Sequence, residues 1–259
     1  MTVDGRTSAA ERPSDRVALV TGGTRGIGRA TGTLLCEEGA RVVLLGRYAE
    51  LGTEVAGSLP GASFVAGDVR RAADVRAAVE ATLARHGRLD ILVNSAGIIH
   101  RNRTVEQHTE EEWDDTFDTN VKGTFLMCRA ALPHLKTAGG NIVNVSSYTG
   151  LVGFAGAAAY AASKAAVVNL TRTMALDHAA DGVRVNCVCP GSVDTDMIHH
   201  AWEATGDVEA AARAWAAKHP IGRIATGEEV ARVILFLASD AASFVTGVAL
   251  PVDGGITAA

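Results

Sequence analysis

Two polar side chains interrupt an apolar stretch in the second half of the chain. The segment "AAAYAASKAAVV", residues 157–168, is made almost wholly of Ala and Val, but it carries Tyr160 and Lys164 four residues apart. Residues at this spacing share a helix face, so the phenol and the ammonium can point into the same cleft. An unperturbed phenol has a pKa of about 10, and a neighbouring cation lowers it by stabilising the phenolate. We expect Tyr160 to carry a proton near neutral pH and Lys164 to tune it.

Two further residues could complete this chemistry. Ser147 ends the segment "NIVNVSS", thirteen residues before Tyr160. Ligands bind at the carboxyl ends of strands in open α/β sheets, so the Ser147 hydroxyl could hold a substrate oxygen. Asn120, in "DTNVKGTF", lies within a long helical pattern, where an Asn side chain competes with backbone hydrogen bonds. By itself this position indicates either a local polar contact or a functional role.

A glycine-rich turn near the N-terminus predicts a nucleotide site. The segment "TGGTRGIG", Thr21 to Gly28, follows a predicted strand and leads into a predicted helix. Gly22, Gly26 and Gly28 permit a tight turn, a close approach of the backbone to a pyrophosphate, and close packing of helix on strand. The helix N-terminus would offer free N–H groups and partial positive charge to the phosphates. Strand, turn and helix together favour cofactor binding over an ordinary turn.

Strand-like and helix-like segments alternate along the chain. Short β-branched runs predict strands at 16–21, 40–46, 62–68, 89–95, 140–147, 183–189 and 247–253. Helical patterns fall between them, at Ile27–Glu38, Ala49–Ser58, Ala72–His86, Glu110–Leu135, Tyr160–Ala179 and Gly227–Leu237. This alternation indicates an α/β fold, a Rossmann-type doubly wound parallel sheet of about seven strands with helices on both faces.

The chain is expected to form a single domain. Residues 1–14 form a polar segment that we interpret as a flexible tail, and residues 15–259 are the catalytic domain. The segment from Ser192 to Pro220 interrupts the alternation and predicts one or two short helices that cover a site as a lid.

Composition argues against several classes of partner. The net charge is -5, and Lys and Arg are scattered without a basic stripe, so we expect no nucleic-acid partner. No apolar run is long enough for a membrane span, and no secretory signal is evident, which favours a cytoplasmic protein. Cys36, Cys128, Cys187 and Cys189 are expected to be buried free thiols, the last two on opposite sides of a strand, and no metal site is expected.

The glycine spacing T-G-x(3)-G-x-G, together with the Tyr and Lys pair, resembles the short-chain dehydrogenase/reductase family, and the resemblance extends from Val17 to Gly255. It implies NAD(P)(H)-dependent hydride transfer between a ketone and a secondary alcohol. Ser147, rather than Ser146, fits the family's spacing, and Asn120 would distort its helix and hold a water that links Lys164 to solvent. The catalytic residues implied are Asn120, Ser147, Tyr160 and Lys164.

The same resemblance implies a set of cofactor contacts. Asp68 in "GDV" would bond the adenine, "NSAG" would lie under the cofactor, and Thr195 would meet the carboxamide. Besides Tyr160 and Lys164, the set is Gly22, Thr24, Arg25, Gly26, Ile27, Gly28, Arg47, Asp68, Val69, Asn94, Ala96, Gly97, Pro190, Gly191, Val193 and Thr195.

Cofactor choice depends on the end of the second strand. The position at which an NAD enzyme carries a carboxylate is Gly46 here, and it is followed by Arg47. Arg25, in the glycine loop, offers a second cation for a 2′-phosphate. NADP(H) is therefore favoured and NAD(H) is possible, although both arginines could also be solvated surface charges.

The substrate is expected to be a small carbonyl or alcohol compound, hydrophobic or ring-bearing rather than an anionic sugar acid. Ser147 and Tyr160 would contact it, and the expected walls are His100, Tyr148, Leu151, Val152, Phe154, Met197, His199 and Trp202. Each wall residue could equally be ordinary packing.

Three alternatives to this ketoreductase remain. "GRIATGEEVARVILFLASD" resembles 3-oxoacyl-(acyl carrier protein) reductases, but Pro133 and Leu176 stand where that group carries carrier-docking arginines. "NSAGII" resembles sugar or polyol dehydrogenases. A nucleotide-binding regulator is the non-enzyme alternative, which the presence of Ser, Tyr and Lys disfavours. The apolar helices at 113–135 and 160–179 resemble the family's interface helices and imply a homotetramer.

Overall fold

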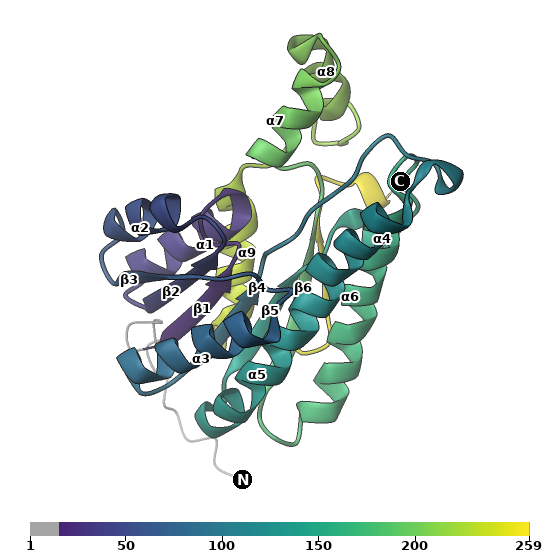
Figure 1. Ribbon diagram of the computed structural model, residues 1–259. Coiled ribbons are helices and arrows are strands. Elements are labelled where there is room, and N and C mark those ends of the chain that lie inside the picture. Colours follow the sequence, from purple (N-terminus) through teal and green to yellow (C-terminus); the bar gives the residue numbers. More distant parts are fainter. Residues whose placement is uncertain (1–15, 259) are drawn as a thin grey trace.

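The computed structural model describes residues 16–258, which form one α/β layer structure. Seven parallel strands form a single sheet in the order β3-β2-β1-β4-β5-β6-β7 (Figure 1). Their bounds are β1 Val17–Thr21, β2 Arg41–Gly46, β3 Ala62–Ala66, β4 Ile91–Asn94, β5 Asn141–Val145, β6 Arg184–Pro190 and β7 Ala249–Val252. The predicted doubly wound parallel sheet is confirmed, and each observed strand lies within one residue of its predicted range or inside it.

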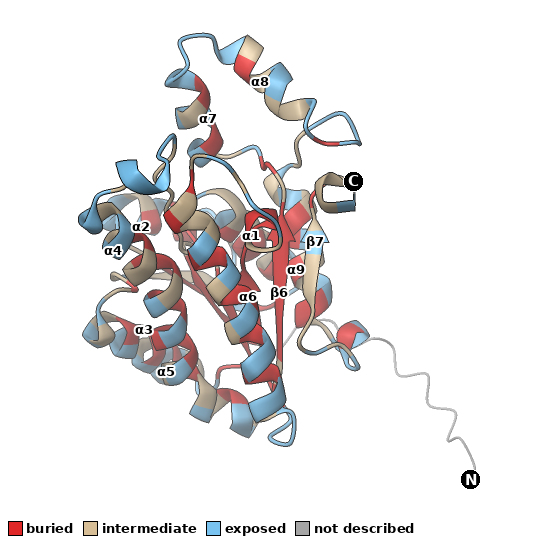
Figure 2. Cartoon of the chain, turned by 90° about the vertical axis from the view of Figure 1, so that its right-hand side faces the viewer, coloured by how far each residue is buried: buried red, intermediate tan, exposed pale blue. Residues whose placement is uncertain are grey.

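Helices cover both faces of the sheet because the interior strands are apolar on both sides. In β1, Ala18 and Val20 pack into one core cluster, and Leu19 between them packs into the other. The first cluster is covered by α1 Gly26–Glu37, α2 Ala49–Gly57 and α9 Gly227–Ala238. The second is covered by α3 Ala72–His86, α5 Gly123–Ala138 and α6 Ala158–His178. Figure 2 shows the buried strands between these helices.

The strand order reverses between β1 and β4, which are neighbours in the sheet although they are not consecutive in sequence. Open α/β sheets bind ligands in the crevice at such a switch point, outside the carboxyl ends of the strands. The segments after β1, β4, β5 and β6 all emerge at this edge, where they bring the predicted glycine loop and catalytic residues together.

The segment predicted to act as a lid, called the lid below, forms two short helices, α7 Asp196–Glu203 and α8 Val208–Ala216. They rise above the carboxyl edge of the sheet, away from the core (Figure 1). Ile198, Trp202 and Ala211 bury one another in a small cluster of their own. His219 Nε2 accepts a hydrogen bond from the Ser192 N–H at 3.0 Å, so the end of the lid is fixed to its beginning.

Two sequence expectations need correction. The helix predicted over Glu110–Leu135 is three segments: α4 Glu110–Phe117, a π-helical turn Asp118–Lys122, and α5. Cys187 and Cys189 share one side of β6, with their Sγ atoms 4.0 Å apart, because residues two apart on a strand point the same way. The four thiols are free, as expected, but Cys36 is only partly buried, because it lies near the exposed end of α1, whereas the other three are buried.

The predicted tail, residues 1–14, lies outside the described residues. Within residues 16–258, no helix combines the length and the apolar character that crossing a bilayer requires. The same part of the chain holds no group of three or more His, Cys, Asp or Glu side chains placed to bind a metal.

Candidate active site

The glycine loop after β1 is packed too closely against its neighbours to admit side chains at Gly22 and Gly28. Gly22 has a φ of +64°, and a Cβ there would lie 2.9 Å from the Ala96 backbone nitrogen. A Cβ on Gly28 would lie 2.3 Å from the Gly22 carbonyl oxygen, so only glycine lets α1 pack against the loop. No side chain caps the α1 N-terminus at Arg25, and its first N–H groups are available to a ligand. A pyrophosphate fits this arrangement.

A cavity of about 720 Å³ begins at this loop and runs along the carboxyl edge to Tyr160. Sixteen of the predicted cofactor contacts line it, namely Gly22, Thr24, Arg25, Gly26, Ile27, Arg47, Asp68, Val69, Ala96, Gly97, Tyr160, Lys164, Pro190, Gly191, Val193 and Thr195. The other two predicted contacts, Gly28 and Asn94, do not line the cavity. Asn94 instead donates from Nδ2 to Asn144 Oδ1 at 2.8 Å, joining the ends of β4 and β5.

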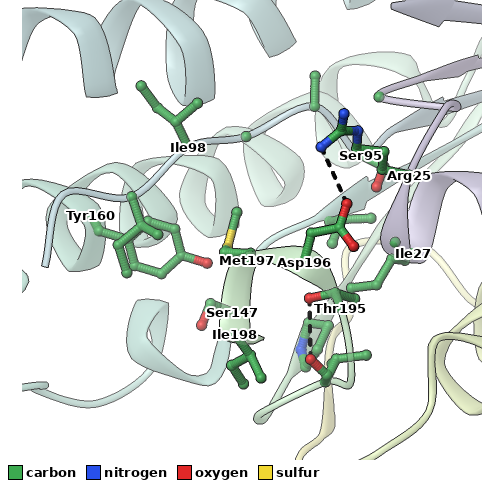
Figure 3. Close-up of a pocket in the computed structure, with 18 of the residues that line it drawn as sticks. Arg25, Ile27, Ser95, Ile98, Ser147, Tyr160, Thr195, Asp196, Met197 and Ile198 are labelled. Carbon is green, nitrogen blue, oxygen red and sulfur yellow. Dashed lines mark hydrogen bonds and ion pairs between the residues drawn. The ribbon is translucent and has the colours of Figure 1, made fainter. Parts of the chain in front are cut away.

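Tyr160 and Ser147 face the same end of the cavity (Figure 3). The Ser147 Oγ accepts hydrogen bonds from the Thr149 N–H at 3.2 Å and from the Thr149 hydroxyl at 3.1 Å. Because both bonds use Ser147 as the acceptor, its own proton is free to be donated to an oxygen in the cavity.

Lys164 lies beneath Tyr160, one helical turn further along α6. Its Nζ donates to the Val145 carbonyl at 2.8 Å and lies 5.6 Å from the centre of the Tyr160 ring. Burial lowers the pKa of the Lys164 ammonium from 10.5 to about 8. Burial also raises the pKa of the Tyr160 phenol, whereas the Ser147 hydroxyl and the charge of Arg101 oppose that rise. Two cations, Lys164 and Arg101, therefore surround the phenol.

Asn120 lies in the π-helical turn, and its side chain bonds outside its own helix. Its Oδ1 accepts from the Ile98 N–H at 2.9 Å, and its Nδ2 donates to the Ile98 carbonyl and to Ser163 Oγ, both at 3.0 Å. A methyl group placed on Gly97 would lie 3.3 Å from both Asn120 Oδ1 and Lys164 Nζ. The turn therefore holds the β4 loop against α6 next to the lysine, as π-turns often do at functional sites.

The cofactor end of the cavity carries cations. The guanidinium carbons of Arg25 and Arg47 lie 5.4 Å and 5.7 Å from the centre of the Tyr48 ring. Arg25 also pairs with Asp196 of the lid at 3.2 Å, the contact drawn across the cavity in Figure 3. Asp68, the predicted adenine contact, pairs with Arg70 at 2.6 Å, which holds the pKa of its carboxyl below the usual range.

The opposite end of the cavity has mixed walls. Tyr148, Phe154 and Met197 line it as expected. The other expected wall residues do not line the cavity, namely His100, Leu151, Val152, His199 and Trp202. His100 lies 3.6 Å from Asp115, and Trp202 is in the core of the lid.

Sequence reasoning missed Arg101 and Trp215 in this wall. The available signal was the run "HRNR", residues 100–103, directly after the turn that follows β4.

Comparison with known proteins gives concordant matches over nearly the whole chain. The family model described as enoyl-(acyl carrier protein) reductase, of the short-chain dehydrogenase type, matches residues 22–257. A cis-4-hydroxycyclohexanecarboxylate dehydrogenase from Sinomonas cyclohexanicum is 45% identical over 250 residues, which cover 95% of this chain and 98% of the relative. A 3-oxoacyl-[acyl-carrier-protein] reductase from Chlamydia muridarum is 38% identical over 248 residues, 93% of this chain and 97% of the relative.

A solved structure shows the same fold. The ligand-free aldohexose dehydrogenase of Thermoplasma acidophilum superposes with a TM-score of 0.89 at 33% identity, covering 95% of this chain and 96% of that one.

Proposed function

The chain belongs to the short-chain dehydrogenase/reductase family and is an oxidoreductase of that family; on this premise we propose that it interconverts a ring-bearing ketone and the corresponding secondary alcohol, with NADP(H) as the preferred cofactor. The observation that carries the proposal is the continuity of one cavity. It joins the glycine loop, which fits a pyrophosphate, to the paired hydroxyls of Tyr160 and Ser147.

Each side chain has a defined task in this reaction. The nicotinamide, when bound, supplies or accepts the hydride at the carbonyl carbon. In the reductive direction, Tyr160 donates its phenolic proton to the carbonyl oxygen, and the Ser147 hydroxyl donates a hydrogen bond that orients that oxygen. In the oxidative direction Tyr160 takes the proton back. The Lys164 ammonium stabilises the phenolate that exists between these steps.

Asn120 would hold the water through which the proton donated by Tyr160 is replaced from solvent. Its side-chain amide is already bonded to Ile98 and Ser163. We place a water at its main-chain carbonyl, which accepts from the Thr124 hydroxyl at 2.8 Å and lies in the π-helical turn, where the regular helical hydrogen-bond pattern is interrupted. We propose that this water links Lys164 to solvent.

The test is turnover of NADPH and NADH with ketones that differ in size and charge, using the wild type and Tyr160→Phe. Removing the phenolic hydroxyl removes the general acid, so we expect Y160F to lose roughly 100-fold or more in kcat. Its affinity for the cofactor should change little. Near-wild-type turnover by Y160F would contradict the assignment, and Tyr148→Phe, which alters a wall phenol, is the matched comparison.

The preference for NADP(H) is supported by charge. Gly46 places no carboxylate at the end of β2, and Arg25 and Arg47 flank the Tyr48 ring beside it. A 2′-phosphate there would gain charge-assisted hydrogen bonds. We expect NADPH to bind more tightly than NADH, and Arg47→Gln to weaken NADPH about tenfold and NADH hardly at all. Arg29→Gln, an exposed arginine outside the cavity, is the control. Tighter binding of NADH by the wild type would overturn the preference.

A cyclic substrate is supported by the cavity walls and by the relatives. Tyr148, Phe154, Met197 and Trp215 offer broad apolar surfaces on which a ring can pack. The Sinomonas relative is named for a hydroxycyclohexanecarboxylate. A sugar is the alternative substrate, because the structurally similar Thermoplasma protein is named as an aldohexose dehydrogenase. The carrier-protein reductase is less well supported, because Pro133 and Leu176 replace the expected docking arginines.

A homotetramer working in the cytoplasm completes the proposal. The free thiols agree with a reducing compartment. Large apolar side chains are exposed on two faces that the family resemblance marks as interfaces. One face holds Trp113, Phe125 and Leu176, and the other, beside edge strand β7, holds Phe236 and Phe244. Exposed apolar patches of this kind mark association sites.

A further inference from the structure

Arg101 is a cation in the cavity wall that has no anionic partner among the residues the structure describes. It follows β4 and lines the cavity together with Tyr148 and Tyr160. Its Nε is buried and without a hydrogen-bond partner, and no ion pair involves it within residues 16–258. Its neighbours on the same loop differ, because His100 and Arg103 both lie near Glu112, at 4.0 Å and 3.5 Å. The loop therefore places its outer basic side chains near Glu112, whereas Arg101, which faces the cavity, has no acidic neighbour of this kind among the described residues.

The protein compensates this charge only in part. The Arg101 guanidinium carbon lies 4.9 Å from the centre of the Trp215 ring, a distance at which a cation and a π-system attract. Burial lowers the pKa of the guanidinium, yet an arginine keeps its proton in a protein. Arg101 is half-buried, with its Nε shielded from water, and a charge that is partly removed from water is costly unless an opposite charge approaches it.

No carboxylate of the cavity can serve as that partner. The carboxylates in its lining are Asp68 and Asp196, and both are at the cofactor end, paired with Arg70 and Arg25. A second cation stands at the outer side of the substrate end. Lys218 Nζ lies 4.8 Å from the centre of the Trp215 ring and 5.7 Å from that of Phe154. This end of the cavity is therefore positively charged.

We propose that Arg101 binds a carboxylate of the substrate, so that the enzyme acts on alicyclic keto acids and hydroxy acids. This inference rests on the proposed function. The planar guanidinium matches a carboxylate with two parallel hydrogen bonds. With the carboxylate held at Arg101 and the carbonyl oxygen at Tyr160 and Ser147, the ring between them packs against Phe154, Met197 and Trp215. Arg101 is thus the group that selects an acid over an uncharged ketone of the same shape.

The decisive experiment compares 4-oxocyclohexanecarboxylate with 4-methylcyclohexanone, which have the same ring and differ in charge. Wild type should show a kcat/KM about 10- to 100-fold higher for the acid, the range of a buried charge-assisted contact. Arg101→Gln should lose that preference mainly through the KM of the acid, so that its kcat/KM values for the two substrates lie within about threefold of each other. Arg101→Lys should be intermediate, because it keeps the charge and loses the fork geometry.

The control is Arg103→Gln, on the same loop but paired with Glu112, which should leave both substrates unaffected. A loss of kcat on both substrates in R101Q with the preference for the acid retained would mean that Arg101 acts on Tyr160 alone, and it would overturn the proposal. A wild type that does not distinguish the acid from the ketone would also overturn it.

A binding measurement separates this inference from the proposed function. Cyclohexanecarboxylate has neither a ketone nor a hydroxyl group and cannot react. Its titration into the protein with NADP⁺ therefore reports binding alone. We expect the wild type to bind it and to bind cyclohexanecarboxamide at least tenfold more weakly. Tighter binding of the acid than of the amide would support the carboxylate site even if no ketone were reduced. The absence of ketone reduction would contradict only the proposed reaction. If R101Q does not fold, the comparison of acid and amide on wild type and R101K decides, and equal affinities would refute the proposal.

Discussion

At the scale of single residues, burial sets the chemistry of the two central groups. Lys164 is 5% exposed and Tyr160 is partly buried, so water stabilises the charged form of each only weakly. The pKa values are consequently displaced in opposite directions, down for the ammonium and up for the phenol. Charges near the two groups, such as that of a bound cofactor, would offset the effect of burial on these pKa values.

The lowered pKa of Lys164 has a consequence for stability. The native pKa is about 8 against an ordinary value of 10.5, so below pH 8 the buried charge opposes folding. As the pH rises from about 8 to about 10.5, the unfolded chain holds the proton that the native protein has released, and stability increases. Relative to Lys164→Met, the cofactor-free wild type should gain about 2 kcal/mol between pH 7 and pH 9.5.

Urea unfolding of both proteins at the two pH values measures this difference. Groups that titrate elsewhere cancel, because both proteins contain them. A difference that stays constant with pH would show that Lys164 is solvated in the folded protein.

At the scale of elements, the carboxyl edge is organised by close approaches between segments. The β1 loop packs on α1 through Gly22 and Gly28, and the π-turn joins the β4 loop to α6 through Asn120. His219 joins the end of the lid to its beginning by a hydrogen bond, and the ion pair between Arg25 and Asp196 joins the lid to the glycine loop. These contacts place groups from four strand ends and the lid around one cavity.

The glycine loop permits a matched pair of substitutions. Gly28→Ala places a Cβ 2.3 Å from the Gly22 carbonyl oxygen, and the backbone must shift to admit it. We expect G28A to weaken NADPH at least tenfold and to lower the melting temperature. Gly57→Ala also replaces a helical glycine, but it meets nothing within 4 Å and should stabilise the protein by up to about 1 kcal/mol. Cofactor titration and thermal unfolding of both variants measure these effects, and equal behaviour would remove the packing argument.

At the scale of the whole molecule, the apolar surface is unevenly distributed. Phe244 is fully exposed and Leu176 is 83% exposed, although the core itself is closed on both faces of the sheet. β7 is an edge strand, with β6 on one side only. A sheet edge beside exposed aromatic side chains favours association over a free monomer.

Light scattering tests this association directly. The wild type should have about four times the 26.8 kDa mass of one chain. Because a buried carboxylate without a partner is costly, Phe244→Asp should reduce the mass to that of dimers. Thr53→Asp, which also adds a carboxylate but at an exposed residue of α2 away from both proposed interfaces, serves as the control and should leave the mass unchanged. A monomeric wild type would contradict the tetramer.

The sequence alone determined the features that depend on local pattern. The alternation of β-branched runs with helical periods specified the parallel sheet, because both periods follow from backbone geometry. The glycine spacing after β1 indicated the candidate cofactor loop, and the Tyr160 and Lys164 pair indicated the proposed proton carrier, because in both cases residues that are close in sequence are also close in space.

Only the tertiary structure decided the features that depend on distant contacts. Asp68 pairs with Arg70, Trp202 lies in the core of the lid, and the long helix breaks at Asn120 because its amide bonds to Ile98, twenty-two residues away. Arg101 belongs to this group, since its charge matters through what surrounds it in the described part of the chain: two tyrosines and a tryptophan, but no acid. Sequence spacing cannot report the absence of a counter-charge, because ion partners are brought together by the fold.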